Sequence, residues 1–463
     1  RRTRRPKHDH LARSLPRRLN QFLPRTGGAR GGDCAAEPSH PMTSATNEKC
    51  DALPNHSTTP GANAGSAAHC HPEFIFRIFL PQLHRIAAQA MTDQPSKKQT
   101  HSEKVPLAPP PRLTSDSLEL PGPLEAIEAY FENGWSDGLP VVPPTPEAVT
   151  AMLAAANLAA DAILGIEPVK GAVITAEKAG INAVMAGCKP EYMPVVAAAV
   201  DAITQPEFNL HGITVSTMGA AIMLIVNGPI INEIEINGGV SAFGPGYRAN
   251  ATIGRAIRLI VMNVLGTRSN DGLDKATLGH SGKYTWCVAE NEKKLPENWS
   301  PLHVTRGINE SESAVTVVSG LSATQFGEHE ANTPEGILDA FAQRLYPMGP
   351  GVKQVVLVIC PEHAAHFTKA GWKKEQVGQY LYENATKLTS EWIAMGLPSG
   401  AQKDSNAELS TESGDLPISV LDSPESAIPI VVGGDGGAWS AVIPPWSLGS
   451  RSKIVTRPII TNK

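Results

Sequence analysis

Cys188 is the residue whose type and position best suit covalent chemistry. It lies in NAVMAGCKPEYMPVV, residues 182–196, just before a helix that we expect to begin near Pro190. A sulfur at a helix N-terminus faces free backbone N–H groups and the positive end of the helix dipole, which favour a thiolate. The sequence therefore predicts a nucleophile, and the alternative is a small buried hydrophobic residue, as most free cysteines are.

A second group of reactive side chains lies in residues 278–292, LGHSGKYTWCVAENE. If residues 284–290 form a strand, Cys287 points to the core and Glu290 emerges at the carboxyl end, where ligands bind in α/β sheets. His280 is then a candidate general base, with Glu290 as its orienting partner or as an acid. The alternative is a glycine-rich turn followed by a half-buried strand.

His211 is a further candidate for proton transfer, and it raises the alternative of a metal site. His211, His280 and Glu290, with Cys287 and His303, are all able to ligate a metal ion. Their spacing contains no compact motif such as HExxH, HxH or CxxC. We therefore predict no metal and no other cofactor, and keep a metal-dependent hydrolase or lyase as the alternative.

Arg248 and Asn250 indicate an anion site at the start of a long predicted helix that Asn250 would cap. A helix N-terminus beside a guanidinium suits a carboxylate or phosphate group. Gly244-Pro245-Gly246 precedes them, but its proline stiffens the turn and the preceding strand is expected to end several residues earlier. A dinucleotide-binding motif is therefore disfavoured, and the plain alternative is a loop with a helix cap.

A glycine-rich turn, GGDGG at residues 433–437, follows a predicted buried strand. The N–H groups of Gly434 and Gly436 can form a nest that holds an anion. Asn291, at the end of the predicted 284–290 strand, is a third candidate for substrate binding. Ser440 is a secondary candidate nucleophile outside any G-x-S-x-G motif.

The segment CPEHAAHF, residues 360–367, places Cys360 at the end of a predicted strand and two histidines on the helix that follows. His363 and His366 lie three residues apart. We interpret them as polar residues at a helix start near a sheet edge.

Strand-like and helical segments alternate along the chain, which predicts an α/β fold with mixed, layered sheets and helices. We expect two subdomains, residues 119–320 with the candidate site and residues 321–463 with a serine-rich loop at 396–418. Short strands are predicted at 211–219, 220–228 and 232–238. No exact internal repeat is present.

Residues 1–118 are predicted to be a disordered leader, because they are basic at the start and proline-rich at the end. We favour an over-extended reading frame whose true start lies near Met91. The alternative is an organellar presequence, since the first residues are rich in arginine and poor in acids.

Charge and cysteine usage narrow the partners and the compartment. The formal net charge is −5, although residues 1–33 are strongly basic, so the rest of the chain is acidic and unsuited to nucleic acid. No run of 18 apolar residues indicates a membrane span. The six cysteines include no CxxC pair, which fits a reducing, cytoplasmic location.

Four segments together resemble a bacterial family, namely GWSDGLPVVPPTPE, NAVMAGCKPEYMPVV, LGHSGKYTWCVAENE and GGDGGAWSAV. The family is poorly characterised and is associated with proteins that bear a UGSC selenocysteine/cysteine motif. The resemblance covers roughly residues 120–460. It implies no defined reaction, and the chain has neither selenocysteine nor a CGSC motif at its terminal glycine turn.

The leading hypothesis is an enzyme with a cysteine thiolate that cleaves an acyl, amide or carbon–sulfur bond in a small anionic substrate. Cys188 attacks, His280 or His211 carries protons, and Arg248 with Asn250 binds the anion. The alternatives are the metal-dependent hydrolase or lyase and a non-catalytic binding or partner subunit. Alanine-rich helices also allow a homo-oligomer.

Overall fold

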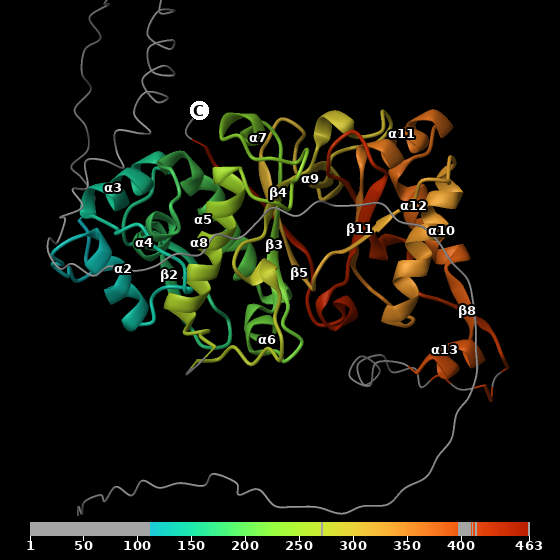
Figure 1. Ribbon diagram of the computed structural model, residues 1–463, viewed down its shortest axis with the longest axis horizontal. Helices are drawn as coiled ribbons and strands as arrows, with labels where there is room; N and C mark the ends of the chain where they lie inside the picture. The colour runs from blue at the N-terminus through green and yellow to red at the C-terminus, as the bar shows by residue number, and fades with distance from the viewer. Residues whose placement is uncertain (1–111, 270–271, 397–408, 410, 413, 462–463) are drawn as a thin grey trace, which may run out of the picture. The chain divides into compact units, whose positions relative to one another are not determined.

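The computed structural model describes residues 112–269, 272–396, 409, 411–412 and 414–461 (Figure 1). Nearly all of the predicted leader at 1–118, including Met91, lies outside the described residues, as does much of the serine-rich segment at 396–418. The described chain belongs to one compact unit, residues 103–463. The predicted α/β class is confirmed, with four mixed or antiparallel sheets in the described part.

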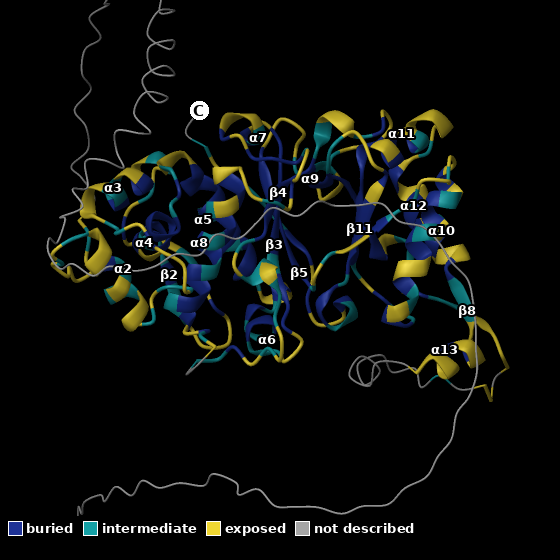
Figure 2. Cartoon of the chain, in the orientation of Figure 1, coloured by how far each residue is buried: buried dark blue, intermediate teal, exposed yellow. Residues whose placement is uncertain are grey.

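Two four-stranded sheets pack face to face, and helices cover the outer face of each. The described residues therefore form four layers, in the order helix, sheet, sheet, helix. In Figure 1, α3, α4, α5 and α8 lie to one side of the first sheet, and α10, α11 and α12 lie beyond the second. Figure 2 shows the buried residues concentrated in the two central layers.

The first sheet has the order β12-β5-β3-β4. Its strands are β3 (Ala221–Asn227), β4 (Cys287–Ala289), β5 (Ala314–Gly320) and β12 (Val455–Pro458). β3 and β4 are parallel, whereas β3–β5 and β5–β12 are antiparallel. β12, from the predicted second subdomain, thus completes the sheet of the first.

The second sheet, in the order β10-β7-β11-β6, repeats that pattern of one parallel and two antiparallel pairings. Its strands are β6 (Thr324–Gly327), β7 (Val355–Ile359), β10 (Ala427–Val431) and β11 (Trp439–Ile443). β12 holds in the first sheet the place that β6 holds in the second. The two sheets therefore share the same pattern of parallel and antiparallel neighbours, although β6 comes first along the chain in its sheet and β12 comes last in its own.

Both faces of each sheet are buried, and this explains the continuous apolar runs in the sequence. Along β3, Met223 and Ile225 contact the second sheet, while the alternate residue Leu224 packs against the helices. Along β7, Val358 faces the first sheet and Ile359 faces the outer helices. Side chains alternate across a strand, so a strand covered on both sides is apolar at most positions.

Helices on the first sheet are α3 (Pro146–Ala155), α4 (Ala176–Ala186), α5 (Met193–Ile203) and α8 (Arg248–Leu265). Those on the second are α10 (Pro334–Leu345), α11 (Pro361–Ala370), α12 (Lys374–Asn384) and α13 (Thr389–Met395). The other helices and strands are α2 (Pro123–Glu132), β1 (Ile163–Ile166), β2 (Val173–Thr175), α6 (Leu210–Val215), α7 (Ile230–Glu233), α9 (Leu302–Thr305), β8 (Thr386–Leu388) and β9 (Pro417–Ser419). Within the described chain, no helix has the length and apolar character needed to cross a membrane.

Two of the predicted strands are wrong. Residues 211–219 contribute to α6, because Asn209 adopts a left-handed conformation and its side chain accepts a hydrogen bond from the N–H of Gly212, which caps a helix. The predicted strand at 232–238 begins inside α7, which starts directly after Pro229 and ends at Glu233. The remaining residues of that segment form no strand. Asn250 is not the cap of α8 either, since the helix begins two residues earlier at Arg248.

The carboxyl ends of the parallel strand pairs in the two sheets meet at one edge. Asn291 follows β4, and its N–H donates a hydrogen bond to the carbonyl of Val431 at the end of β10, at 2.7 Å. Its side-chain amide donates to the carbonyl of Gly433, at 3.2 Å. Loops that leave β3, β4, β7 and β10 are therefore gathered at this edge, where α/β proteins often place their sites.

Candidate functional site

Cys188 lies at the end of one helix, whereas a thiolate would need the start of the next. Gly187 ends α4 in a left-handed conformation, and the N–H of Cys188 donates to the carbonyl of Ala183, at 2.9 Å. In this cap the residue after the glycine packs back on the helix. The following helical turn begins only at Pro190, with Lys189 as its N-cap.

Burial confirms that packing. Cys188 is 6% exposed and belongs to the apolar core beneath the first sheet. Burial raises the pKa of its thiol to about 12, and the hydroxyl of Thr252 and the charge of Arg248 offset this only in part. The expected solvated thiolate at Cys188 is therefore wrong, because its helix cap turns the sulfur into the core.

The two residues expected to bind an anion at α8 differ in their surroundings. Arg248 is exposed, and its Nε donates to the carbonyl of Gly187, so it does lie beside the Cys188 loop. Asn250 is buried, and its amide exchanges hydrogen bonds with the backbone of Asn237 and donates to the carbonyl of Cys287. The fold uses both donors of this amide, which corrects the expected contact between Asn250 and a substrate.

His280 is engaged through both ring nitrogens. Its Nδ1 accepts from the N–H of Gly282, at 3.2 Å, and its Nε2 lies 3.3 Å from the carbonyl of Gly320, to which it can only donate. Burial lowers its pKa, so the ring is neutral at pH 7. A base needs a lone pair directed at a group whose proton it can take, and Nδ1 of His280 is directed at the backbone N–H of Gly282 instead. His211 lies on α6, where no described contact joins it to Cys188.

Glu290 emerges at the carboxyl end of β4, as predicted, but not next to His280, which precedes that strand. It is buried, and its Oε2 accepts from the N–H of Leu302 and from the amide of Asn227. Lys374 Nζ lies 3.6 Å from its Oε1. Glu290 therefore links β3, α9 and α12. The expected pairing with His280 is wrong.

Cys360, which the sequence did not favour, has the surroundings that were expected for Cys188. It is the N-cap of α11, immediately before Pro361, and His363 is the third residue of that helix. Ser440, on the neighbouring strand β11, accepts a hydrogen bond from the N–H of Cys360, at 3.1 Å. The hydroxyl of Ser440 lies 2.7 Å from Nδ1 of His363. Three reactive side chains thus meet at the carboxyl edge of the second sheet.

The ring of His363 is held in one tautomer. Its Nε2 lies 2.9 Å from the carbonyl oxygen of Glu328, and because a carbonyl only accepts, Nε2 carries a hydrogen. In the neutral ring, Nδ1 is then the basic nitrogen, and it accepts a hydrogen bond from the hydroxyl of Ser440, while the thiol of Cys360 interacts with the same imidazole. A base with its second nitrogen fixed by an acceptor is the arrangement that nucleophilic catalysis needs.

The electrostatics of Cys360 are opposite to those of Cys188. Burial alone raises the pKa of Cys360, but the imidazole and backbone N–H of His363, with the hydroxyl of Ser440, outweigh it, and the pKa lies below its ordinary value. Burial likewise lowers the pKa of His363, yet Cys360 and the carbonyl of Glu328 raise it above its ordinary value. Each of the two groups therefore stabilises the charged form of the other.

The glycine turn at 433–437 passes over this end of α11. A Cβ placed on Gly433 would lie 4.0 Å from Cβ of Cys360, and beyond the turn the N–H of Ala438 donates to Glu362 in the first turn of α11. Gly433 is tied to Asn291, and its own N–H donates to the carbonyl of Gly238. The glycine turn that contains Gly434 and Gly436, together with Asn291 that binds it, thus lies beside Cys360 and not beside Cys188.

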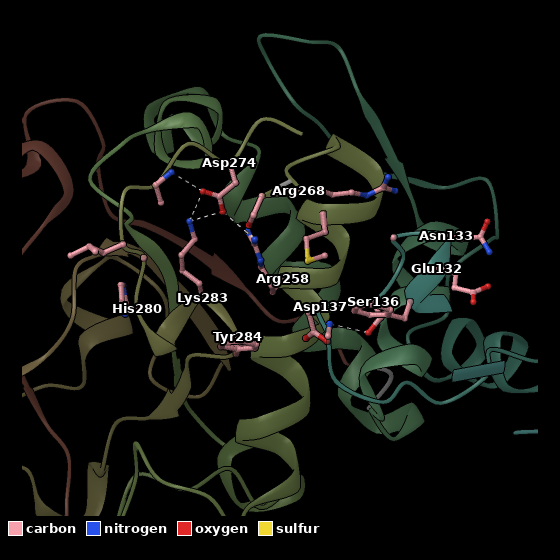
Figure 3. Close-up of a pocket in the computed structure, with 18 residues that line it drawn as sticks. Glu132, Asn133, Ser136, Asp137, Arg258, Arg268, Asp274, His280, Lys283 and Tyr284 are labelled. Carbon is pink, nitrogen blue, oxygen red and sulfur yellow. Dashed lines mark hydrogen bonds and ion pairs between the residues drawn. The ribbon is translucent and has the colours of Figure 1, made fainter. Parts of the chain in front are cut away.

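A separate cavity of about 860 Å³ lies on another part of the surface (Figure 3). It brings together the predicted segments GWSDG and LGHSGKY and includes His280. Its polar and charged lining consists of Glu132, Asn133, Ser136, Asp137, Arg258, Arg268, Ser269, Asp274, His280, Lys283 and Tyr284. Cys188, Glu290, His211 and Cys360 are not among its lining residues.

No protein-family model matches the chain, and no curated protein matches it either. The resemblance to the UGSC-associated family stays a prediction. The three ligands of the metal alternative, His211, His280 and Glu290, are not brought together. Within the described ranges no group of three histidine, cysteine or acidic side chains is placed to hold a metal ion.

A sequence signal for the Cys360 site does exist. A cysteine at the N-cap and a histidine at the third helical position face one another across the first turn, and CPEH has that spacing. Ser440 was predicted only as a secondary nucleophile, and its place beside His363 could not be found in this way. The same holds for Glu328, since the two come from β11 and from the residue after β6, far away in the sequence.

Proposed function

We propose that the chain is an enzyme in which Cys360 is the nucleophile and His363 the base, acting on a small molecule that carries an anionic group. The observation that carries the proposal is the Cys360–His363 pair itself, with Nε2 of His363 anchored on the carbonyl of Glu328. The proposed reaction class is the one expected from the sequence, but Cys360 takes the role predicted for Cys188, and His363 takes the role predicted for His280.

The anionic group of the substrate would be held by backbone donors. The glycine turn at 433–437 passes close to Cys360 at the start of α11, and the backbone N–H groups of such turns and of helix N-termini bind carboxylate or phosphate. Gly434 and Gly436 have no side chains to block that approach. Asp435 is paired with Lys294, at 2.9 Å, which reduces its repulsion of an anion.

The reaction best suited to these groups is acyl transfer to water. The thiolate of Cys360 forms a bond to the carbonyl carbon of an ester or amide, and the bond to the leaving group breaks as that group takes the proton from the imidazolium of His363. Water then attacks the thioester and gives its proton to His363. Cys360 leaves as a thiolate, and the original ion pair is restored.

The proposal is tested by trapping the acyl-enzyme on the full chain. The p-nitrophenyl esters of acetic acid and of succinic acid serve as uncharged and anionic acyl donors, and mass spectrometry of peptides locates the acyl group. We expect it on Cys360, faster with the succinyl ester, in the unchanged chain and in Cys188→Ala, and absent in Cys360→Ala. An acyl group on Cys188 or on no cysteine would contradict the proposal.

A further inference from the structure

The cavity in Figure 3 lies at the opposite edge of the first sheet from Cys360. Its wall at residues 276–280 contacts the segment that leads into β3: the N–H of Thr277 donates to the carbonyl of Thr217. Cys360, in contrast, follows the carboxyl end of β7, on the side where β4 and β10 end. The cavity is therefore separate from the proposed catalytic site and needs its own explanation.

Two of its cations share one carboxylate. Lys283 Nζ lies 2.6 Å from Asp274 Oδ2, and Arg258 Nη2 lies 3.2 Å from the same oxygen. The three residues carry one excess positive charge. The pKa of Asp274 is lowered: burial raises it, but the contact with Lys283 and the charge of Arg258 outweigh that effect. The carboxylate thus stays ionised and orients both cations along one wall.

A third cation, Arg268, has no ion-pair partner in the part of the chain that the structure describes, and its buried Nε has no hydrogen-bond partner there. The nearby carboxylate of Asp137 is not available, because Arg255 binds both of its oxygens, at 2.8 and 2.9 Å. The Nε itself is closed to solvent, so a ligand would meet this guanidinium at its Nη nitrogens, of which Nη1 lies beside Gly134 in the cavity wall.

Gly134 lies against the guanidinium of Arg268. Its φ is +67°, and a Cβ placed there would lie 3.4 Å from Nη1 of Arg268, so the guanidinium rests close to the bare backbone of the GWSDG segment. On another wall Tyr284 is half exposed and offers its hydroxyl as a further donor. Figure 3 shows Arg258, Arg268 and Lys283 around the same hollow.

We infer that this cavity binds a small organic anion through a carboxylate or phosphate group, with Arg268 as its principal ligand and Lys283 and Tyr284 as further donors. A guanidinium binds such groups through paired, charge-assisted hydrogen bonds. The volume is that of sites for small molecules. The site is independent of the proposed chemistry at Cys360, since neither Cys360 nor His363 lines it.

Titration calorimetry on the full chain, with inorganic phosphate and succinate as separate probes at constant ionic strength, tests this inference. We expect saturable binding of at least one probe, weakened about tenfold or more in Arg268→Gln. Arg268→Lys should fall between the two. Arg344→Gln is the matched control: Arg344 lies on α10, over the ring of Phe326 and outside the cavity lining, so this variant should bind as the unchanged chain does.

Binding of neither probe in the millimolar range would overturn the inference, and equal affinity in Arg268→Gln would overturn the role of Arg268. If Arg268→Gln fails to fold, as judged by circular dichroism, Tyr284→Phe provides the second test, with a smaller expected loss. Cys360→Ala should bind both probes normally. A failed acyl-trapping experiment therefore leaves this result unaffected, and the two proposals fail separately.

Discussion

Cys188 and Cys360 look alike in sequence, since each lies just before a proline-led helix, but they occupy different structural positions. Cys188 is the second residue beyond the end of α4 and packs into the apolar core. Cys360 is the N-cap of α11 and lies outside the three apolar clusters of the described residues. Nearly equal exposure, 6% and 4%, thus accompanies opposite pKa shifts.

The comparison shows that burial alone does not decide the reactivity of a cysteine. Both thiols lose hydration, which disfavours the thiolate. Each thiol has a hydroxyl beside it, but Cys360 also receives compensation from an imidazole and a helix N-terminus, whereas Cys188 has only Thr252 and a solvated Arg248. What lies within hydrogen-bonding reach of the sulfur is therefore more informative than its exposed area.

The largest expected difference is in alkylation rate. At pH 7 iodoacetamide should modify Cys360 about a thousand times faster than Cys188, because a thiol with a pKa of about 12 is almost never ionised and the pKa of Cys360 lies below that of a free thiol. Mass spectrometry of peptides against time measures both rates in one sample. Similar rates at the two cysteines would abolish the distinction drawn between them.

Replacing each cysteine by serine should show that the two side chains are packed in different surroundings. Cys188→Ser places a hydroxyl in apolar surroundings and should lower the free energy of unfolding by about 1–3 kcal/mol. Cys360→Ser creates a favoured N-cap residue and should change it by less than about 1 kcal/mol. Urea unfolding followed by circular dichroism measures both. A larger loss in Cys360→Ser than in Cys188→Ser would show that the two environments have been assigned the wrong way round.

His363→Gln should slow alkylation of Cys360 about tenfold at pH 7, which corresponds to about one pKa unit. The thiolate of Cys360 is present above its lowered pKa and disappears as pH falls through that pKa. Without His363 the pKa should be higher, so the increase of the alkylation rate with pH should occur at a higher pH in the variant than in the unchanged chain. His366→Gln is the control, because His366 lies one turn further along α11. Equal pH profiles for His363→Gln and the unchanged chain would remove His363 from the site.

The smallest expected effect concerns the ion pair that joins Lys294 to Asp435 in the glycine turn. Both side chains are exposed, at 46% and 70%, and such pairs contribute about 0.2–1 kcal/mol at most. Lys294→Ala should therefore leave the alkylation rate of Cys360 within about twofold and stability nearly unchanged. A tenfold change in rate would instead mean that this ion pair positions the turn over α11.

The sequence predicted the fold class well because the apolar strands β3, β5, β7 and β10 are long, bounded by turns and rich in β-branched residues. Strands were wrongly predicted where local capping prevailed, as at Asn209, whose side chain starts α6. The pattern also indicated the glycine turn and Asn291. It could not tell which cysteine they accompany, since that depends on the pairing of β7 with β10 and β11.

The sheet pairing of β12 also affects how the chain acquires its structure. Thr456 on this strand bonds Thr316 on β5, and 140 residues separate the two in sequence. Until that distant segment arrives, β5 is an open sheet edge, able to pair with other chains. During synthesis the first sheet can close only after the whole second sheet has emerged, so the two halves must mature together, and slow closure of such distant contacts is the expected bottleneck in folding.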